Sequence, residues 1–494
     1  LTLMLLDAPG ATTAGTMRIG LFEWTVLGPD VLGEFALGAA AIAFVVGLGS
    51  FFSADRAAAT APRTAGLFAV AGSGAPLLIL VVIYLRYAPF ETRPALGVVS
   101  LALAGVFAGM AERLIARRPA DFAAPSPAFY AVGSVLALAF ASSIGLAAGF
   151  IPLALALGAA GVAWVALSRP VPALPWLAVL LAALACAALL TNPPLSPAET
   201  GATPLLNGLI PRLGLPAAAV ILAGELLRRN RGGAPAELLQ AIGLALAALF
   251  VVAEIRHFAH DGVIHAGVPG LGEQSALTLA VLAFSLGLQR IAARTESRVY
   301  HAASMIGGLG GAGAIAVAHF ITANPIATGE YVGEHFLFNL LLPGYLLPAL
   351  KAAWVAAAAR RVRPRWYVLV VAALALALGF AYVTLMVRHA FHGGRLDLGA
   401  ISDTENWAYS AVWLGFGIAL LAAGVVRGSL AMRAASGIVI AAVICKVFLF
   451  DMAALTGALR AASFLGLGAT LIVIGRLYQR LLTRTGPGVT AASA

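Results

Sequence analysis

Charged residues are scarce in this chain of 494 residues. Only 11% of its residues are Asp, Glu, Lys or Arg, whereas about a quarter of the residues in a soluble domain are charged. Hydrophobic residues make up 61% of the sequence. A water-soluble core could not bury that much apolar surface, so the composition excludes a soluble globular protein.

Cysteine and catalytic motifs are also nearly missing. The two cysteines, Cys186 and Cys445, each lie inside an apolar run, which excludes a disulfide framework and a cysteine-based metal site. The sequence has no P-loop, no zinc-protease motif and no G-x-S-x-G elbow, so we do not expect ATP hydrolysis and predict no cofactor. The glycine cluster IGGLGGAG at residues 306–313 lacks the flanking strand of a nucleotide-binding loop, and close helix packing explains it better.

What the sequence does contain is a series of apolar runs of about twenty residues, the length needed by helices that cross a hydrocarbon layer of about 30 Å. Ala and Leu dominate these runs and no ten-residue alternation of apolar and polar residues occurs, so strands are not expected. The predicted fold is an all-α, polytopic transmembrane helix bundle of about 15 spans. The spans are predicted at residues 35–53, 64–86, 95–115, 127–148, 150–168, 172–190, 206–228, 235–257, 273–293, 300–322, 335–359, 366–388, 404–426, 432–451 and 458–483.

The arginines predict the orientation of these spans. When the spans alternate across the membrane, one set of ends carries 21 arginines and the other set 8, and both lysines lie within spans. The arginine-rich side is expected to be cytoplasmic, which puts the N-terminus outside and the C-terminus inside a bacterial inner membrane. The net charge of +10 therefore comes from arginines at the ends of the spans, and we expect no nucleic-acid partner.

The N-terminal segment, residues 1–34, is predicted to be extracytoplasmic. The chain starts at Leu1 without Met, and its first residues, LTLMLLDAPG, lack the basic region of a signal peptide. Either a processed precursor or a truncated longer protein is expected.

An internal repeat organises the second half of the chain. Asn207 and Asn339 are 132 residues apart, and the same offset without a gap relates Arg256 to Arg388 and Glu273 to Glu405. Each copy holds four spans, an even number, so the copies are expected to run in the same direction and not as an inverted repeat. The predicted domains are a six-span region at 35–190, repeat 1 at 203–334, repeat 2 at 335–457, and a final span with a cytoplasmic tail at 458–494.

Residues 446–480, KVFLFDMAALTGALRAASFLGLGATLIVIGRLYQR, resemble the closing segment of a bacterial family of predicted multispanning membrane proteins, catalogued as domain of unknown function 2339. The doubled segments EIRHFAHDG and MVRHAFHGG are similar to that family too. The resemblance is closest over residues 207–480. It implies the architecture and leaves the activity open.

The doubled RHxxH segments are the main candidate cluster, because histidines three apart share one helix face and can bind a metal or move protons. The alternative is that Arg and His at a helix C-terminus compensate its dipole. No metal site is predicted outright, and the weak candidates for metal ligands are His257, His260, His389 and His392. The candidate functional cluster comprises Arg256, His257, His260, Asp261, Glu273, Arg388, His389, His392 and Glu405.

Charges inside spans are a second clue, since a charge at the bilayer centre costs about 2.5 to 3.5 kcal/mol and persists when it is paired or functional. Asp451 is expected to pair with a cation, either Arg460 across a short outer loop or Lys446 from the turn below, whose spacing of five makes it the poorer partner. Either a structural ion pair or a transport role would explain this pairing. The intramembrane charges are Glu254, Lys351, Lys446, Asp451 and Arg460. The sequences Asn207-xxx-Pro211 and Asn339-xxx-Pro343 are interpreted as capped helix starts.

Three functions remain open. The first is transport or translocation of a small solute, an ion or an envelope lipid. The second is an enzyme embedded in the membrane, a transferase or hydrolase that acts on a lipid-linked substrate at the outer face, and the third is a structural subunit of an envelope complex. The expected partners are membrane lipids and either further copies of the chain or a larger membrane complex.

Overall fold

A computed structural model describes the chain at residues 13–19, 22–27, 29–87, 91–117, 124–169, 171–193, 196–201, 203–230, 232–265, 267–295 and 297–451, and at a few helical positions from 465 to 476. Over these residues the fold is all-α apart from one short N-terminal hairpin, with fourteen helices long and apolar enough to cross a membrane. The fifteenth predicted span, 458–483, falls mostly outside the described residues. The chain divides into two compact units, residues 1–266 with 297–299, and residues 267–296 with 300–494.

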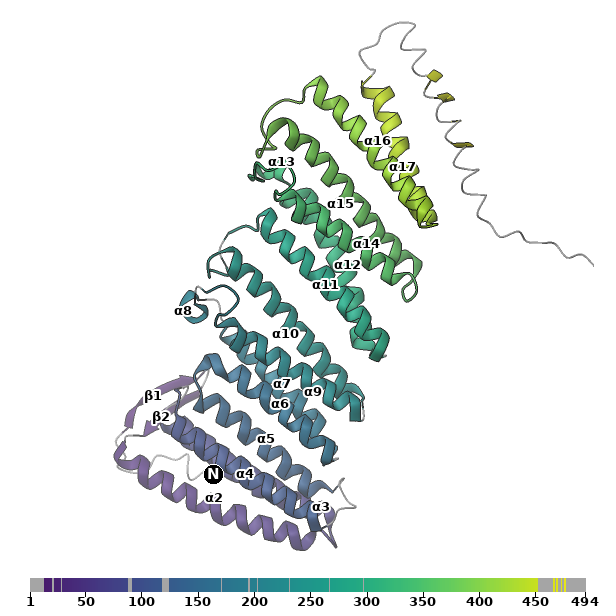
Figure 1. Ribbon diagram of the computed structural model, residues 1–494. Coiled ribbons are helices and arrows are strands. Elements are labelled where there is room, and N and C mark those ends of the chain that lie inside the picture. Colours follow the sequence, from purple (N-terminus) through teal and green to yellow (C-terminus); the bar gives the residue numbers. More distant parts are fainter. Residues whose placement is uncertain are drawn as a thin grey trace, which may run out of the picture. The chain divides into compact units, whose positions relative to one another are not determined.

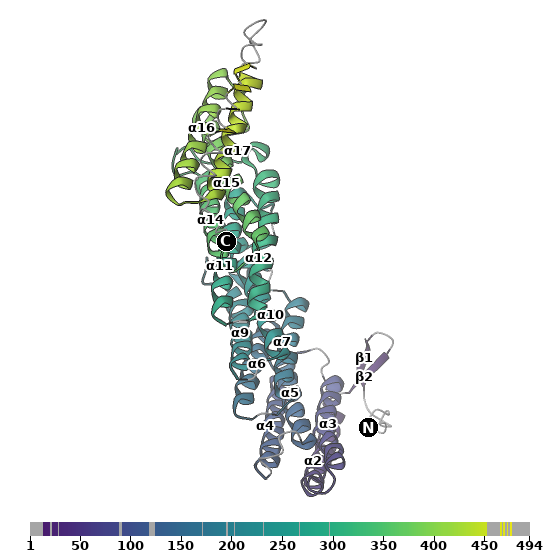
Figure 2. The same cartoon turned by 90° about the vertical axis from the view of Figure 1, so that its right-hand side faces the viewer.

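Unit 1 holds the first eight candidate spans. Within it α4 packs on α5, α2 on α3, and α6 on both α7 and α9 (Figures 1 and 2). Phe107 and Tyr130 are almost fully buried where α4 and α5 meet. Its elements are α2 (Pro29–Ala57), α3 (Pro62–Tyr87), α4 (Pro94–Arg117), α5 (Pro125–Gly145), η1 (Ala148–Phe150), α6 (Ile151–Ser168), α7 (Leu174–Thr191), α8 (Pro197–Thr200), η2 (Ile210–Gly214), α9 (Leu215–Asn230) and α10 (Ala234–Ala259).

Unit 2 holds the next six spans. Helix α14 packs on α15 and α11, and α16 packs on α15 and α17. Tyr345, Tyr367 and Leu378 are at most 1% exposed in its core. Its elements are α11 (Leu271–Thr295), α12 (Arg298–Val317, which begins in unit 1), η3 (Ala318–Thr322), α13 (Pro325–Thr328), η4 (Leu342–Leu346), α14 (Leu347–Ala359), α15 (Arg365–His392), α16 (Asp403–Val426), α17 (Leu430–Lys446) and η5 (Val447–Asp451).

One predicted span starts too early. The sequence placed a helix from residue 335, but η4 begins at Leu342. The Oδ1 of Asn339 accepts a hydrogen bond from the N–H of Leu341 at 3.0 Å, so this residue forms an Asx turn that holds the chain outside the helix. The apolar residues before it, although hydrophobic enough for a span, belong to a loop.

The expectation that the chain contains no strands is wrong for its first described residues. Strands β1 (Thr13–Ile19) and β2 (Phe22–Leu27) pair antiparallel, and Met17 lies opposite Trp24. Both strands are rich in Thr and in β-branched and aromatic residues, which favour extended backbone. The hairpin lies within the segment 1–34, before the first candidate span.

Two spans start with a π-helix. In η2 the N–H of Leu215 bonds the carbonyl of Ile210, and in η4 the N–H of Leu347 bonds the carbonyl of Leu342. The next residue in each case is a proline, Pro216 or Pro348, which has no N–H to donate to the carbonyl four residues back. The wider turn gives these spans one extra residue before the α-helix proper, a feature often found at functional sites.

Two glycines of the cluster at residues 306–313 receive side chains from neighbouring helices, which is a looser contact than the close helix packing that the sequence predicted. A Cβ on Gly308 would lie 2.0 Å from the Oη of Tyr367 on α15, and one on Gly311 would lie 2.5 Å from a methyl group of Val281 on α11. A Cβ on Gly310 or Gly313 would meet nothing within 4 Å.

Candidate functional site

The second RHxxH segment forms a closed polar cluster at the end of α15. Arg388 and Glu405 are 3.0 Å apart, and their side chains are 8% and 0% exposed. The Nε of Arg388 donates to the carbonyl of Leu396, and its Nη2 donates to the carbonyls of Leu398 and Gly399. All five N–H groups of the guanidinium therefore have an acceptor nearby.

Two further side chains complete this cluster. The Nε2 of His392 lies 2.8 Å from Oε2 of Glu405 and 2.7 Å from Nη1 of Arg388, and the hydroxyl of Tyr409 donates to Oε1 of Glu405 at 2.9 Å. Ser402 caps α16 by accepting from the N–H of Glu405 at 3.2 Å. The cluster ties the loop between α15 and α16 to both helices, and its polar groups are already occupied.

The first RHxxH segment is anchored in a similar way in unit 1. The Nε2 of His257 lies 2.8 Å from the carbonyl of Gly201, and the Nε of Arg256 donates to the carbonyl of Ile264 at 2.6 Å. In unit 2, 132 residues later, His389 Nε2 lies 2.7 Å from the carbonyl of Gly333. A carbonyl only accepts, so Nε2 carries the proton in both histidines.

Asn207 links this segment to an intramembrane carboxylate. Its Nδ2 donates to Oε2 of Glu254 at 2.9 Å and lies 3.3 Å from Nδ1 of His257, while its Oδ1 accepts from the N–H of Leu209 at 2.8 Å. The residue 132 positions after Glu254 is Met386, whose sulfur lies 3.8 Å from Nδ2 of Asn339. Each asparagine thus accepts from the N–H two residues on, in an Asx turn. The predicted helix caps are not formed, because the N-cap residues are Leu209 and Leu341 and neither start has a side-chain cap hydrogen bond.

These contacts do not favour a metal site at the RHxxH segments. His257 and His389 use Nε2 as a donor, and His392 is held by Glu405 and Arg388, so the ring nitrogens are not turned toward one another. In the part of the chain that the structure describes, no group of three or more His, Cys, Asp or Glu side chains is arranged to hold a metal ion. The histidine segments serve as anchors that fasten helix ends to loops.

A different set of polar residues lies inside the span of α11. Ser275, Thr278, Ser285 and Gln289 are at most 4% exposed, and their spacing of three, seven and four residues keeps them on one helix face. We call these four residues, with the buried Glu273 at their start, the α11 polar face. The hydroxyl of Ser285 donates to the carbonyl of Ser304 on α12 at 2.9 Å.

The α11 polar face continues into neighbouring elements at both ends. Arg363, before α15, hydrogen-bonds to Oγ of Ser304 and lies 2.6 Å from Nε2 of His301. Toward the other end, Oγ1 of Thr278 lies 2.8 Å from Nε2 of His319 in η3. Three buried atoms of this set, Nδ1 of His319, Oε1 of Gln289 and Nε of Arg363, have no hydrogen-bond partner among the residues that the structure describes.

One family model matches the chain, over residues 11–481, and its description is Predicted membrane protein (DUF2339). The chain belongs to this family. The resemblance expected from residues 446–480 is thereby confirmed, together with the multispanning architecture. No curated protein and no solved structure matches the chain.

The intramembrane charges of this family member have varied surroundings. Lys446 donates to the carbonyl of Asn406 at 3.0 Å and to Oγ of Ser410 at 2.7 Å, both on α16, and its Nζ lies 5.8 Å from the ring centre of Trp413. Lys351 lies on α14 and is partly exposed. The side chain of Asp451 and the whole of Arg460 lie outside the described residues.

The loops outside the spans carry their own ion pairs. A hydrogen bond from Arg395 lowers the pKa of Asp397, and the hydrogen bond from the Tyr331 hydroxyl to Glu334 raises the pKa of that tyrosine.

Of the remaining sequence candidates, Asp261 follows α10 with a φ of 47° in the left-handed region. His260 caps the C-terminus of α10 through its own N–H, which donates to the carbonyl of Arg256 at 3.0 Å.

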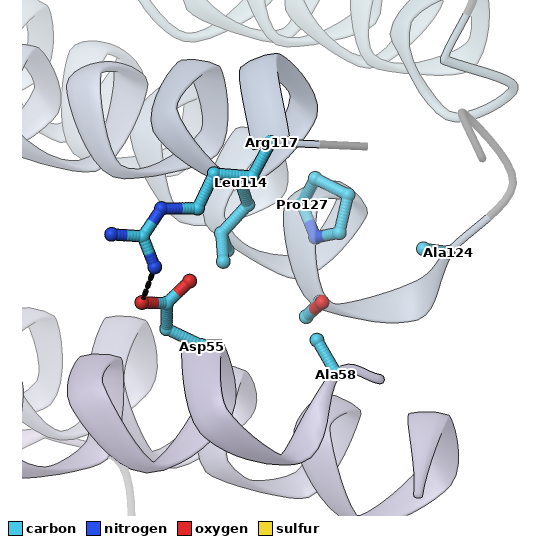
Figure 3. Close-up of a pocket in the computed structure, with 7 residues that line it drawn as sticks. Asp55, Ala58, Leu114, Arg117, Ala124 and Pro127 are labelled. Carbon is cyan, nitrogen blue, oxygen red and sulfur yellow. Dashed lines mark hydrogen bonds and ion pairs between the residues drawn. The ribbon is translucent and has the colours of Figure 1, made fainter. Parts of the chain in front are cut away.

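Unit 1 has a polar cavity of about 340 Å³ between α2, α4 and α5 (Figure 3). Asp55 and Arg117 form an ion pair in its wall, and Leu114 and Pro127 line it beside them. The carboxylate is 13% exposed and the guanidinium 52%. Because the two charges already neutralise each other, this cavity presents no unmatched charge to a ligand.

Sequence reasoning missed Thr278, His319 and Tyr409. A serine or threonine in an apolar run is ordinary, since its hydroxyl can bond its own helix, so Thr278 carried no signal. His319 did carry one, because it lies in the apolar run AIAVAHFITA with no charged neighbour. That pattern differs from the histidines at arginine-containing helix ends.

Proposed function

We propose that this protein transports or translocates a small solute, an ion or an envelope lipid across the bacterial inner membrane, along the α11 polar face of unit 2. The main support for this proposal is that the α11 polar face is buried. From Glu273 to Gln289 it covers seventeen residues, whose Cα atoms rise about 24 Å over sixteen steps of 1.5 Å. That is most of the hydrocarbon thickness of about 30 Å.

Polar groups inside a membrane have two common explanations, a path for a polar substrate or hydrogen bonds that hold helices together. Ser285 serves the second purpose, since it bonds the backbone of α12. Gln289 and His319 support the first, because each has a buried polar atom with no hydrogen-bond partner. Such atoms at two depths are suited to a substrate or water that is bound only in passing.

The arginine distribution supports the direction of this path. In the orientation proposed here, the end of α11 that carries Arg294 and the loop that contains Arg363 are cytoplasmic, so Gln289 lies near the cytoplasmic end of α11 and Glu273 near the outer end. The N-terminus is then extracytoplasmic and the C-terminus cytoplasmic. Lipids contact the apolar outer surface, and further copies of the chain or a larger membrane complex are the proposed protein partners.

The internal repeat is part of this proposal. His257 and His389 are 132 residues apart, and so are the residues whose carbonyls they contact, Gly201 and Gly333. The π-helices η2 and η4 have the same offset. These equivalent contacts support two four-span units of common origin that run in the same direction. We expect residues 207–322 and 339–451 to superpose about an axis roughly along the membrane normal, and an axis in the membrane plane would contradict this.

Cysteine accessibility tests the path directly. In a chain with Cys186→Ala and Cys445→Ala, Ser285→Cys should react with a small, charged, water-soluble thiol reagent, although Ser285 has no exposed surface in the structure. The matched control is Ala283→Cys, two residues away on the exposed side of α11, which should lie in lipid and stay unreacted. If neither cysteine reacts, the polar face only joins helices, and the protein is better described as a structural subunit.

A further inference from the structure

His319 lies where three irregular or polar elements of unit 2 meet. It stands in the π-helix η3, opposite Thr278 of α11 and Tyr345 of the π-helix η4. The exposed fractions of His319, Thr278 and Tyr345 are 0%, 0% and 1%. An imidazole with no exposed surface is therefore placed inside a candidate membrane span, residues 298–328.

The contacts of this histidine leave one ring nitrogen unmatched. Nε2 lies 2.8 Å from Oγ1 of Thr278, the hydroxyl of Tyr345 donates to the backbone carbonyl of His319 at 2.7 Å, and the two rings meet edge to face at 5.5 Å. Nδ1 is buried and has no hydrogen-bond partner in the described part of the chain. The ring is thus fixed on three sides and open at one nitrogen.

The hydroxyl of Thr278 suits two protonation states of this ring. A threonine hydroxyl both donates and accepts, so it can donate to a neutral Nε2 or accept from a protonated one. In the second case the lone pair of Nδ1 is free to take a proton, which makes the ring an imidazolium with an N–H on both nitrogens. Neither change requires Thr278 to move.

The ionisable groups that the neighbouring elements bring to this end are mostly acidic. They are Glu273 on α11, Glu330 after α13, and Tyr345 on η4; α13 itself, packed on η3, has none. Glu330 accepts from the N–H of Leu271 at 2.7 Å. A carboxylate favours the charged form of an imidazole when the two lie within about 4–6 Å of each other.

We propose that His319 is a proton-binding site inside the membrane, which takes a proton at Nδ1 from water on the outer side and releases it again from the same ring. Proton binding is carried by this geometry alone. That the proton is also the ion moved along the α11 polar face rests on the function proposed above.

The first test measures the protonation of His319 in the full chain. The protein is labelled with ¹⁵N-histidine, placed in lipid nanodiscs and followed by NMR from about pH 3.5 to 9, the range around an ordinary imidazole pKa. The signal lost in His319→Gln identifies the residue, and its ring nitrogen shifts are expected to change with pH. Thr278→Val should displace that titration and Thr278→Ser, which keeps the hydroxyl, should not. A neutral His319 across the whole range would overturn the proposal.

The second test separates proton binding from transport. Liposomes containing the protein and an internal pH-sensitive dye should lose an imposed pH gradient faster than empty liposomes, and His319→Gln should return the rate to that of empty liposomes. His335→Gln, in the exposed outer loop, is the matched control and should keep the wild-type rate. A titrating His319 without proton flux would uphold proton binding and count against the transport function. Flux that survives His319→Gln would count against this residue and leave the transport function standing.

Discussion

Glu405 is a carboxylate with no exposed surface, and its charge is balanced by Arg388. Replacing it by Gln removes one charge of a buried pair and leaves the guanidinium uncompensated, so we expect Glu405→Gln to lower the free energy of unfolding by about 3 kcal/mol. Thermal unfolding in detergent would measure the loss. The double variant with Arg388→Met should lose less than the sum of the two single variants, because the residues act as a pair.

The exposed pair Arg395 and Asp397 is the control for that measurement. Its guanidinium is 50% exposed, and solvent screens such pairs strongly. Arg395→Gln should leave the unfolding temperature unchanged. If both Gln variants behave alike, the cluster around Glu405 does not stabilise the fold.

Glu199 gives unit 1 a pH dependence of known sign. The hydrogen bond from Arg212 lowers the pKa of Glu199 in the folded protein. The ionised Glu199 therefore adds to the free energy of unfolding at pH values above the pKa of an unfolded glutamate, about 4.3. This contribution is lost as the pH falls through the lower pKa of the folded protein. Its side chain is 44% exposed, which keeps the contribution below about 1 kcal/mol. Unfolding temperatures of wild type and Glu199→Gln should converge as the pH drops below about 4. A gap that widens there would show the opposite sign.

At this scale the sequence identified polar residues better than it assigned their roles. The RHxxH segments were recognisable because arginine and histidine recur at a fixed offset, and the structure places them as anchors to backbone carbonyls. The role of Thr278 depends on a partner 41 residues away. Such a pairing follows from how α11 and η3 pack, and no local pattern encodes it.

Among the elements, α12 offers a clean comparison of two glycines. Gly308→Ala would put a methyl group against the buried Tyr367 hydroxyl, whereas the methyl group of Gly310→Ala would meet open space. We expect the first change to cost about 1–3 kcal/mol through overpacking. The second should be neutral or slightly stabilising, because alanine favours a helix over glycine. Unfolding of both variants in the same detergent checks this, and an equal response would disprove the contact of the Tyr367 side chain with Gly308.

The limits of most helices could be predicted because hydrophobic length and flanking prolines set them. Pro125 opens α5 and Pro62 opens α3, both near the predicted starts. The late start of η4 could not be predicted from hydrophobicity, because the Asx turn of Asn339 outweighs the apolar residues around it. The β1–β2 hairpin was missed since the composition of the whole chain hid a short segment of strand-forming residues.

For the whole molecule, the two ends of α15 test the orientation. Ala400→Cys lies in the exposed loop after α15 and Arg361→Cys in the exposed turn before it. In a background without native cysteines, an impermeant thiol reagent should label the first in intact cells and the second only after permeabilisation, because arginine-rich loops stay cytoplasmic. Labelling of Arg361→Cys in intact cells would reverse the proposed topology.

The architecture was the most predictable property of the molecule, because a bilayer requires each span to satisfy its own backbone hydrogen bonds over a fixed thickness. That rule acts on every twenty-residue stretch and needs no knowledge of partners. The residues that could carry function follow no such rule. Ser285 and Ala283 lie in the same apolar run, and only the packing of α11 separates the buried one from the exposed one.

The exact number of residues in the π-helix η4 determines where the Tyr345 side chain points. Each residue turns an α-helix by about 100°, and a π-turn holds one residue more than an α-turn. Deleting one residue from Leu342–Leu346 would therefore let the backbone close ordinary α-helical bonds. It would also rotate the preceding turn by about that angle relative to α14. The deletion would therefore make the helix more regular but would turn the Tyr345 hydroxyl away from the carbonyl of His319. The π-turn thus sets the direction of the Tyr345 side chain.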